Sequence, residues 1–204
     1  RLLLMIAATI GLVACGEGFT ASERDVIHAS GDGIMRVLSI ADPTDSLLLR
    51  KESLPVSEQM LRSEEYALLR ERMLQTVQNP EAEGVGIAAP QVGVRRNIIA
   101  VQRFDKEEVL PDGSEGSPFK VYPNIRIVSM SEELEPGPEG CLSVPDRHGD
   151  VLRSQEIIIE YTDYSCKDAG KKLPVVRETV KDFTAVIFQH EIDHLEGVLY
   201  IDRL

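Results

Sequence analysis

Two histidines near the end of the chain, one helical turn apart, are the residues best suited to chemistry. They lie in the segment Gln189-His190-Glu191-Ile192-Asp193-His194. Residues four apart on a helix share one face, so both imidazoles can reach the same metal ion. The glutamate that follows the first histidine lies near that ion and can act as a general base on water. The spacing therefore predicts a hydrolytic metal site with Glu191 as its base.

Such a site needs a third protein ligand besides His190 and His194, with one coordination position left open. One metallopeptidase class takes a histidine three residues after the glycine that follows the motif, but that position is Tyr200. We therefore look upstream, where Cys141 is flanked by glycine. A thiolate and two imidazoles form a tetrahedral set that suits zinc or ferrous iron. The alternatives are a buried apolar role for Cys141 and a pair of core histidines on an amphipathic helix.

An amphipathic helix must carry the histidines. Phe183, Ile187, His190 and His194 fall on one stripe, so the imidazoles point the same way as the apolar side chains. Gly197 supplies the C-terminal stop of this helix. The sequence therefore predicts that the two histidines face the interior of the domain.

The elements that must surround this helix are a second helix and several short strands. An apolar stripe predicts one amphipathic helix over residues 57–78, which Asn79-Pro80 ends. Runs of β-branched residues predict strands at 97–102, 121–128, 156–161 and 171–177, with a turn around residues 111–113. We expect the last two strands to pair with each other.

Length and composition fit one globular domain. The chain has 204 residues, of which 43% are hydrophobic and 27% charged, and its formal net charge is −12. No run of five or more lysines and arginines occurs, so we expect no nucleic-acid partner. The three cysteines are too few for a disulfide framework, and their odd number predicts separate roles. We expect a monomer.

The first fifteen residues predict an export signal that ends in a lipidation site. Residues 2–14 are almost wholly apolar and lead directly into Cys15. This run is too short to span a bilayer as a helix but matches the apolar core of an export signal. Its ending, Leu-Val-Ala-Cys, resembles a bacterial lipobox, in which the cysteine is lipidated. The alternative is an N-terminal helix buried in the fold.

These patterns divide the chain into a signal and lipobox-like segment at 1–15, a tether at 16–35 and a catalytic domain at 36–204. The predicted location is an exported, membrane-anchored bacterial lipoprotein, held through Cys15. A cytoplasmic location is the alternative.

Three stretches occur in a fixed order: GVGIAAPQ at 84–91, EGCLS at 139–143 and QHEIDH at 189–194. Together they resemble the peptide deformylase family, over about residues 36–204. The resemblance implies an α+β fold in which antiparallel sheets pack around a C-terminal metal-binding HExxH helix. It also implies hydrolytic removal of the formyl group from N-formyl-methionyl peptides, with release of formate.

The resemblance implies one divalent metal ion per chain, held by Cys141, His190 and His194. Ferrous iron is the native metal that it implies, and zinc or nickel can occupy the site. By position, Glu191 matches the general acid and base. The remaining matches are the oxyanion-holding groups Gln91 and the Leu142 main-chain N–H, and the substrate-binding residues Gly86, Ile87, Glu139 and Gly140.

Two other functions remain open at this point. One is an HExxH metallopeptidase that acts on unformylated peptides, which Tyr200 argues against. The other is a lipid-anchored protein that binds formyl-peptides without turnover, which would have no need of Glu191 as a base or of Gln91.

Overall fold

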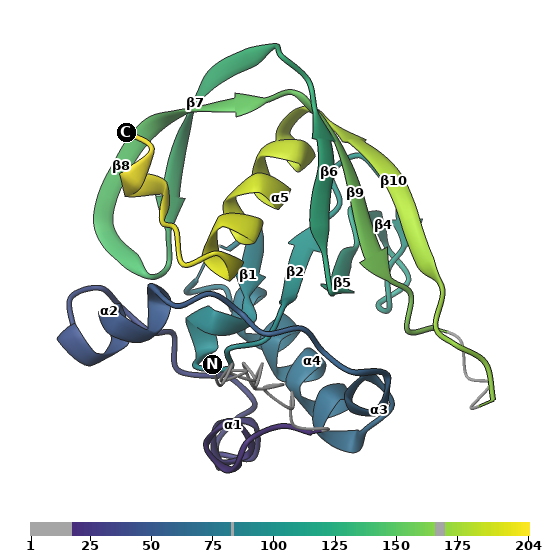
Figure 1. Ribbon diagram of the computed structural model, residues 1–204. Helices are drawn as coiled ribbons and strands as arrows, with labels where there is room; N and C mark the ends of the chain where they lie inside the picture. Colours follow the sequence, from purple (N-terminus) through teal and green to yellow (C-terminus); the bar gives the residue numbers. More distant parts are fainter. Residues whose placement is uncertain (1–17, 83, 166–169) are drawn as a thin grey trace, which may run out of the picture.

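The structure, a computed structural model, describes residues 18–82, 84–165 and 170–204. It is an α+β fold in which helix α5 (Asp182–Leu195) lies between a long β-ribbon and two small sheets (Figure 1). Helices α1 to α4, from the first half of the chain, gather at one end of α5. The predicted fold class is confirmed, since α5 packs against strands of both sheets and of the ribbon.

All the sheets are antiparallel. One has the order β1-β2-β5 (Gly86–Ala88, Ile98–Gln102 and Phe119–Pro123), and the other has the order β10-β9-β6 (Val175–Lys181, Glu156–Thr162 and Arg126–Met130). The short hairpin β3–β4 (Glu108–Val109 and Glu115–Gly116) encloses the predicted turn, where Gly113 has a φ of +84°. The predicted pairing of the last two strands is confirmed as β9–β10, but the second of them, predicted at 171–177, lies at Val175–Lys181.

Strand β2 is buried on both faces and organises the core. Ile98 and Ala100 belong to a cluster that includes the apolar face of α4, whereas Ile99 and Val101 belong to a cluster that includes α5. Alternate residues of a strand point to opposite faces, so one strand joins the two halves of the interior. This packing fixes α5 relative to β1, the strand that borders the metal site.

The predicted single helix over 57–78 is wrong in one respect, because it is two helices, α3 (Glu58–Leu61) and α4 (Glu64–Val77). Ser63 lies between them and is the N-cap of α4, with its Oγ accepting from the Tyr66 N–H at 3.2 Å. Its hydroxyl also donates to the Met60 carbonyl at 2.7 Å. Because the Ser63 side chain hydrogen-bonds to the backbone on both sides of it, it favours the end of one helix and the start of the next.

Sequence patterns did not predict the longest β-element, the ribbon of β7 (Leu134–Cys141) and β8 (Val144–Ser154). Strand β7 contains Pro136 and Pro138, which lack N–H groups and therefore argue against a central strand. In the structure β7 pairs only with β8, so its prolines lie on an edge strand. Between the Gly140 and Cys141 pairings β8 has three extra residues, including Asp146 at a φ of +59°.

Residues 18–35 pack onto the domain and do not form the simple tether predicted for residues 16–35. They contain α1 (Ala21–Ile27), where the Ile27 side chain is fully buried. Glu23 of α1 forms a buried ion pair with Arg96 at 2.9 Å, and Arg72 donates to the Ile27 and Ala29 carbonyls. These partners lie far away in the sequence, so the polar composition of the segment gave no sign of them.

The remaining helices are α2 (Pro43–Leu49) and the 3₁₀ helices η1 (Ala89–Val92) and η2 (Tyr200–Asp202). Within the described part of the chain, no helix has the length and apolar character that crossing a membrane requires. Cys15 and the predicted signal at 1–15 lie outside the described residues.

Candidate metal centre

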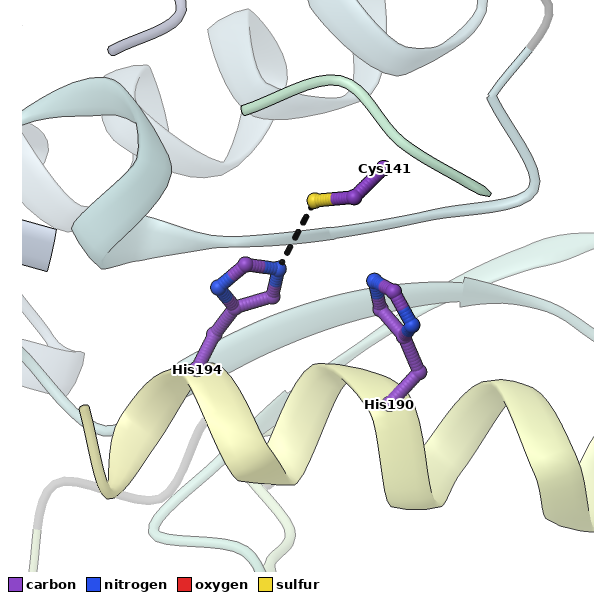
Figure 2. A group of neighbouring side chains, drawn as sticks. All are labelled: Cys141, His190 and His194. Atoms are coloured by element: carbon purple, nitrogen blue, oxygen red, sulfur yellow. Dashed lines mark hydrogen bonds between the residues drawn. The ribbon is translucent and has the colours of Figure 1, made fainter. Parts of the chain in front are cut away.

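The structure brings Cys141, His190 and His194 together (Figure 2). One ligand atom from each lies within 4.8 Å of the other two, and Cys141 Sγ is 3.2 Å from His194 Nε2. Both histidines project from one face of α5, while the cysteine comes from the end of β7 on the facing ribbon. A sulfur and two imidazole nitrogens at this spacing fit one divalent cation of the zinc or ferrous type.

A buried carboxylate orients the first histidine. Glu139 Oε2 lies 2.8 Å from His190 Nδ1, which leaves Nε2 of the same ring for a metal ion. Glu139 also accepts two hydrogen bonds from Arg153, at 2.7 and 3.0 Å. A carboxylate that holds the second nitrogen of a ligating histidine fixes its tautomer and ring orientation.

The same arginine connects the site to the end of the described chain. Arg153 donates to Asp193 at 2.7 Å, and Asp193 also accepts two hydrogen bonds from Arg203, at 2.6 and 2.5 Å. Asp193 is buried and lies on α5 immediately before His194. The ribbon, helix α5 and the residues after it are therefore joined behind the ligands by one network of charged hydrogen bonds.

The two histidines differ in their electrostatics. Burial lowers the pKa of His190, but hydrogen bonds with Cys141 and Glu139 outweigh this effect and raise the pKa to about 10. Burial lowers the pKa of His194 well below its usual value, and the charges of His190 and Arg153 add to the decrease. Metal ions bind neutral imidazole, so metal binding at this site would depend on pH.

Glu191 lies against β1 on the floor of the cleft. Its carboxyl is buried, and burial raises its pKa to about 7, with the negative charges of Glu139 and Asp193 adding to the increase. A Cβ atom on Gly86 would lie 2.5 Å from Glu191 Oε1, so only glycine lets β1 pass this close. Glu191 Oε2 is buried and has no hydrogen-bond partner in the described structure. This geometry leaves one carboxylate oxygen for a ligand or a water molecule.

Gln91 approaches the ligands from η1, at the end of β1. Its Oε1 accepts from the Ala88 N–H at 2.8 Å, which turns the amide nitrogen toward the metal centre. That nitrogen lies 3.6 Å from Cys141 Sγ and 3.2 Å from Ser143 Oγ. An amide held at both ends can present an N–H to a ligand without reorganising.

These groups line one open cleft of about 400 Å³. Gly86, Gln91, Glu139, Gly140, Cys141, Leu142, His190 and Glu191 all border it. Two predicted site residues in the described part of the chain are not among those that border the cleft. His194 is buried, and the Ile87 side chain is buried in the core beside α4. A contact between Ile87 and a ligand would therefore come from its main chain.

Sequence reasoning missed three contributors to this site. Ser143 is fully buried and accepts the Gln91 amide, whereas Asp193 and Arg203 complete the network around Arg153. Their hydrogen-bond partners lie 10 to 52 residues away in the sequence. Of these three residues, Asp193 could most readily have been predicted from the sequence, because it is a charged residue one position before a predicted ligand on a helix that faces the interior.

Comparison with known proteins agrees with this geometry. The polypeptide deformylase family model matches residues 34–204. A peptide deformylase from Leptospira biflexa is 34% identical over 84% of this chain and 88% of its own length, and one from Hyphomonas neptunium is 37% identical over 84% and 85%. A class I type b peptide deformylase from Acinetobacter baumannii, solved with Met-Ala-Ser bound, is 31% identical with a TM-score of 0.68, covering 84% of this chain and 98% of that one.

Proposed function

The chain belongs to the polypeptide deformylase family, a family of metal-dependent hydrolases, and we propose that the residues of its cleft remove the formyl group from N-terminal formyl-methionine. The observation that carries the proposal is the meeting of one sulfur and two imidazoles within 4.8 Å beside a buried carboxylate. A divalent cation held there would polarise the formyl carbonyl and lower the pKa of a water molecule beside Glu191.

Glu191 is the proposed proton carrier. A pKa near 7 lets the carboxylate accept a proton from the attacking water and return it to the departing amine at neutral pH. Its position against Gly86 keeps it in one orientation, and burial excludes competing solvent. The products are formate and a peptide with a free N-terminus.

Gln91 and the main-chain N–H of Leu142 are the proposed donors to the oxygen of the formyl group. Negative charge develops on this oxygen when water attacks the carbon. The Gln91 amide nitrogen lies 3.6 Å from Cys141 Sγ and Leu142 borders the same cleft, which supports a role for both donors beside the reacting carbonyl. Donors fixed before the reaction stabilise that charge without a reorganisation cost.

Peptides are proposed to enter along β1 and the end of β7. Gly86 of β1 and Gly140 of β7 both border the cleft and carry no side chain. A Cβ on Gly140 would lie 2.8 Å from the ring of His148, its partner on β8, so the absence of a side chain there leaves room for that ring in the ribbon. A substrate backbone can therefore lie close to the ligands.

Ferrous iron is the proposed native metal, on the family resemblance and on the suitability of one thiolate and two imidazoles for it. If the chain is exported, zinc is the alternative, because a thiolate–ferrous site is vulnerable to oxidation. Purification under nitrogen followed by elemental analysis separates the two. Iron at about one atom per chain, with activity lost in air, supports ferrous iron; zinc at that ratio contradicts it.

The deciding assay is formate release from a formyl-Met-Ala-Ser peptide by metal-loaded protein, with Glu191→Ala alongside. Formate from the wild type and none from the variant is the expected result. Release of amino acids from unformylated Met-Ala-Ser would instead indicate a metallopeptidase. Saturable binding of the formyl-peptide without any formate would indicate capture without turnover.

We also propose that Cys15 anchors the enzyme to a membrane, on the lipobox-like sequence that precedes it. The expected observation is a lipid-modified Cys15 as the mature N-terminus, detected by mass spectrometry of protein from the membrane fraction. Cys15→Ser should abolish the modification. An unprocessed N-terminus with an unmodified Cys15 would contradict the anchoring proposal.

A further inference from the structure

A second cavity, of about 950 Å³, lies away from the metal centre at the free edge of β5. Residues of α4, of β5 and of the end of β9 surround it, and it shares no lining residue with the metal cleft. Strand β5 is the last strand of its sheet, so its outer edge faces this cavity. The residues used below are Tyr66, Arg70, Phe119, Tyr122, Tyr161 and Tyr164.

The walls of this cavity are unusually aromatic. The chain has five tyrosines, and four of them line the cavity together with Phe119. Their rings are held by contacts with one another: Tyr66 meets Tyr164 edge to face at 5.4 Å, and Tyr122 meets Tyr161 at 4.8 Å. Tyrosine offers a large, rigid and partly polar contact surface at low entropic cost, which is why it is frequent in binding sites.

Charged side chains of both signs line the cavity: Arg62, Arg70 and Lys120 are basic, and Glu71 and Asp163 are acidic. The Arg70 guanidinium lies over the Tyr164 ring, 5.0 Å from its centre, and has no carboxylate partner among the residues that the structure describes. The other cations are engaged, since Lys120 pairs with Glu108 and Arg62 donates to the Lys171 carbonyl.

One buried hydroxyl in the wall lacks a partner. Tyr66 is 2% exposed, and its hydroxyl oxygen makes no hydrogen bond within the described structure. Buried polar groups without partners are rare and cost free energy. A bound acceptor that reached this hydroxyl would supply the missing hydrogen bond.

We propose that this cavity binds an aromatic ring that carries a carboxylate. The ring lies against Phe119, Tyr161 and Tyr164, whose side chains are partly exposed, and the carboxylate pairs with Arg70, whose planar guanidinium suits it. The same chemistry occurs in a free aryl-carboxylic acid and in the C-terminal phenylalanine or tyrosine of a peptide. The proposal is independent of deformylation, because it concerns a separate cavity.

Tyrosine fluorescence provides the test, since the chain contains no tryptophan. The fifth tyrosine, Tyr200, stacks near the metal ligand His190, so the titration uses Tyr200→Phe protein, in which every remaining tyrosine lines the cavity. The protein is loaded with zinc and titrated with 3-phenylpropionate. The uncharged 3-phenylpropanol and the ring-free propionate serve as matched ligands.

The expected result is a saturable change with 3-phenylpropionate that neither matched ligand gives at the same concentration. Arg70→Met should weaken binding at least about tenfold, because a hydrogen bond to a charged group is lost. Arg95→Met, which removes an exposed arginine outside the cavity, should not change it. Formate release should be the same in both variants.

Two results would overturn the proposal. One is no saturable change in tyrosine fluorescence with 3-phenylpropionate up to about 10 mM, and the other is an equal affinity for this ligand with and without Arg70→Met. A further titration separates the two sources of the ligand. Preference for Ala-Ala-Phe with a free C-terminus over its amide, and over 3-phenylpropionate, indicates a peptide end. The reverse order indicates a small aryl acid.

Discussion

Glu139 Oε2 lies 2.8 Å from His190 Nδ1, which places a buried carboxylate from the ribbon behind a ligand on α5. The two residues are 51 positions apart in the sequence. Because Arg153 holds the same carboxylate, the orientation of His190 depends on the pairing of β7 with β8 as well as on α5. The metal centre is therefore set by the packing of two elements, and the first prediction tests this dependence.

Replacing Glu139 should weaken metal binding while leaving the three ligands in place. We expect Glu139→Ala to lower the affinity for zinc by about 10- to 100-fold, the usual effect of losing a partner of a ligating histidine. Glu139→Gln should lose less, because its amide oxygen can still accept from His190. Competition with a chelator measures the affinity. The matched control is Glu135→Ala, an exposed position on the same strand; an equal loss there would contradict the prediction.

Adding one methyl group at Gly86 should reduce turnover more than metal binding. The new Cβ would lie 2.5 Å from Glu191 Oε1, so the carboxylate must move. Displacing a catalytic group by about 1 Å can cost on the order of a hundredfold in rate. The measurement is kcat for formate release together with metal content. Gly137→Ala, where a Cβ meets nothing within 4 Å, should keep full activity.

Gln91→Ala should lower kcat strongly with little change in KM, because its N–H is proposed to act on charge that develops during the reaction. Removing one such donor typically costs about 10²- to 10³-fold in kcat. Steady-state kinetics with a formyl-peptide provide the check, and Gln102→Ala, whose side chain bonds to the Ser117 carbonyl outside the cleft, is the control. A large rise in KM with unchanged kcat would assign Gln91 to substrate binding alone.

The ion pair between Glu23 and Arg96 predicts a loss of stability in acid. Burial alone would raise the pKa of Glu23, but hydrogen bonds from Arg96 and Thr20 outweigh it and lower the pKa below its usual value of 4.5. The ionised carboxylate therefore stabilises the fold above about pH 4.5, and that contribution is lost as the pH falls through the lowered pKa. Thermal melting from pH 7 to pH 3 measures it.

The matched variant for this prediction is Glu23→Gln. Breaking a buried ion pair typically costs about 3–5 kcal/mol, so the variant should melt at a lower temperature at pH 7. The difference in melting temperature from the wild type should narrow as the pH falls from 4.5 through the lowered pKa of Glu23. A difference that stays constant with pH would show that the charge of Glu23 is not the source of the stability.

The sequence by itself predicted the chemistry that is proposed for the site. Two histidines at a four-residue spacing on an apolar stripe predict a helix with both imidazoles on one face, because this geometry is local to a single helix. The three ordered motifs predicted the cysteine ligand and the deformylase family. The strands from Asn97 to Gln102 and from Glu156 to Tyr161 also follow local rules, since β-branched residues favour extended backbone.

Tertiary structure alone decided how these residues are held. Glu139 and Arg153 form their ion pair across the ribbon of β7 and β8, whose strands were not predicted because β7 contains prolines. Asp193 and Arg203 form theirs because the chain turns at Gly197, after the end of α5. The packing of α1 depends on Arg72 and Arg96, which lie about 45 and 73 residues away from their partners. Local sequence patterns do not predict such long-range pairs. A buried charge needs a partner, and only the folded structure shows which residue that partner is.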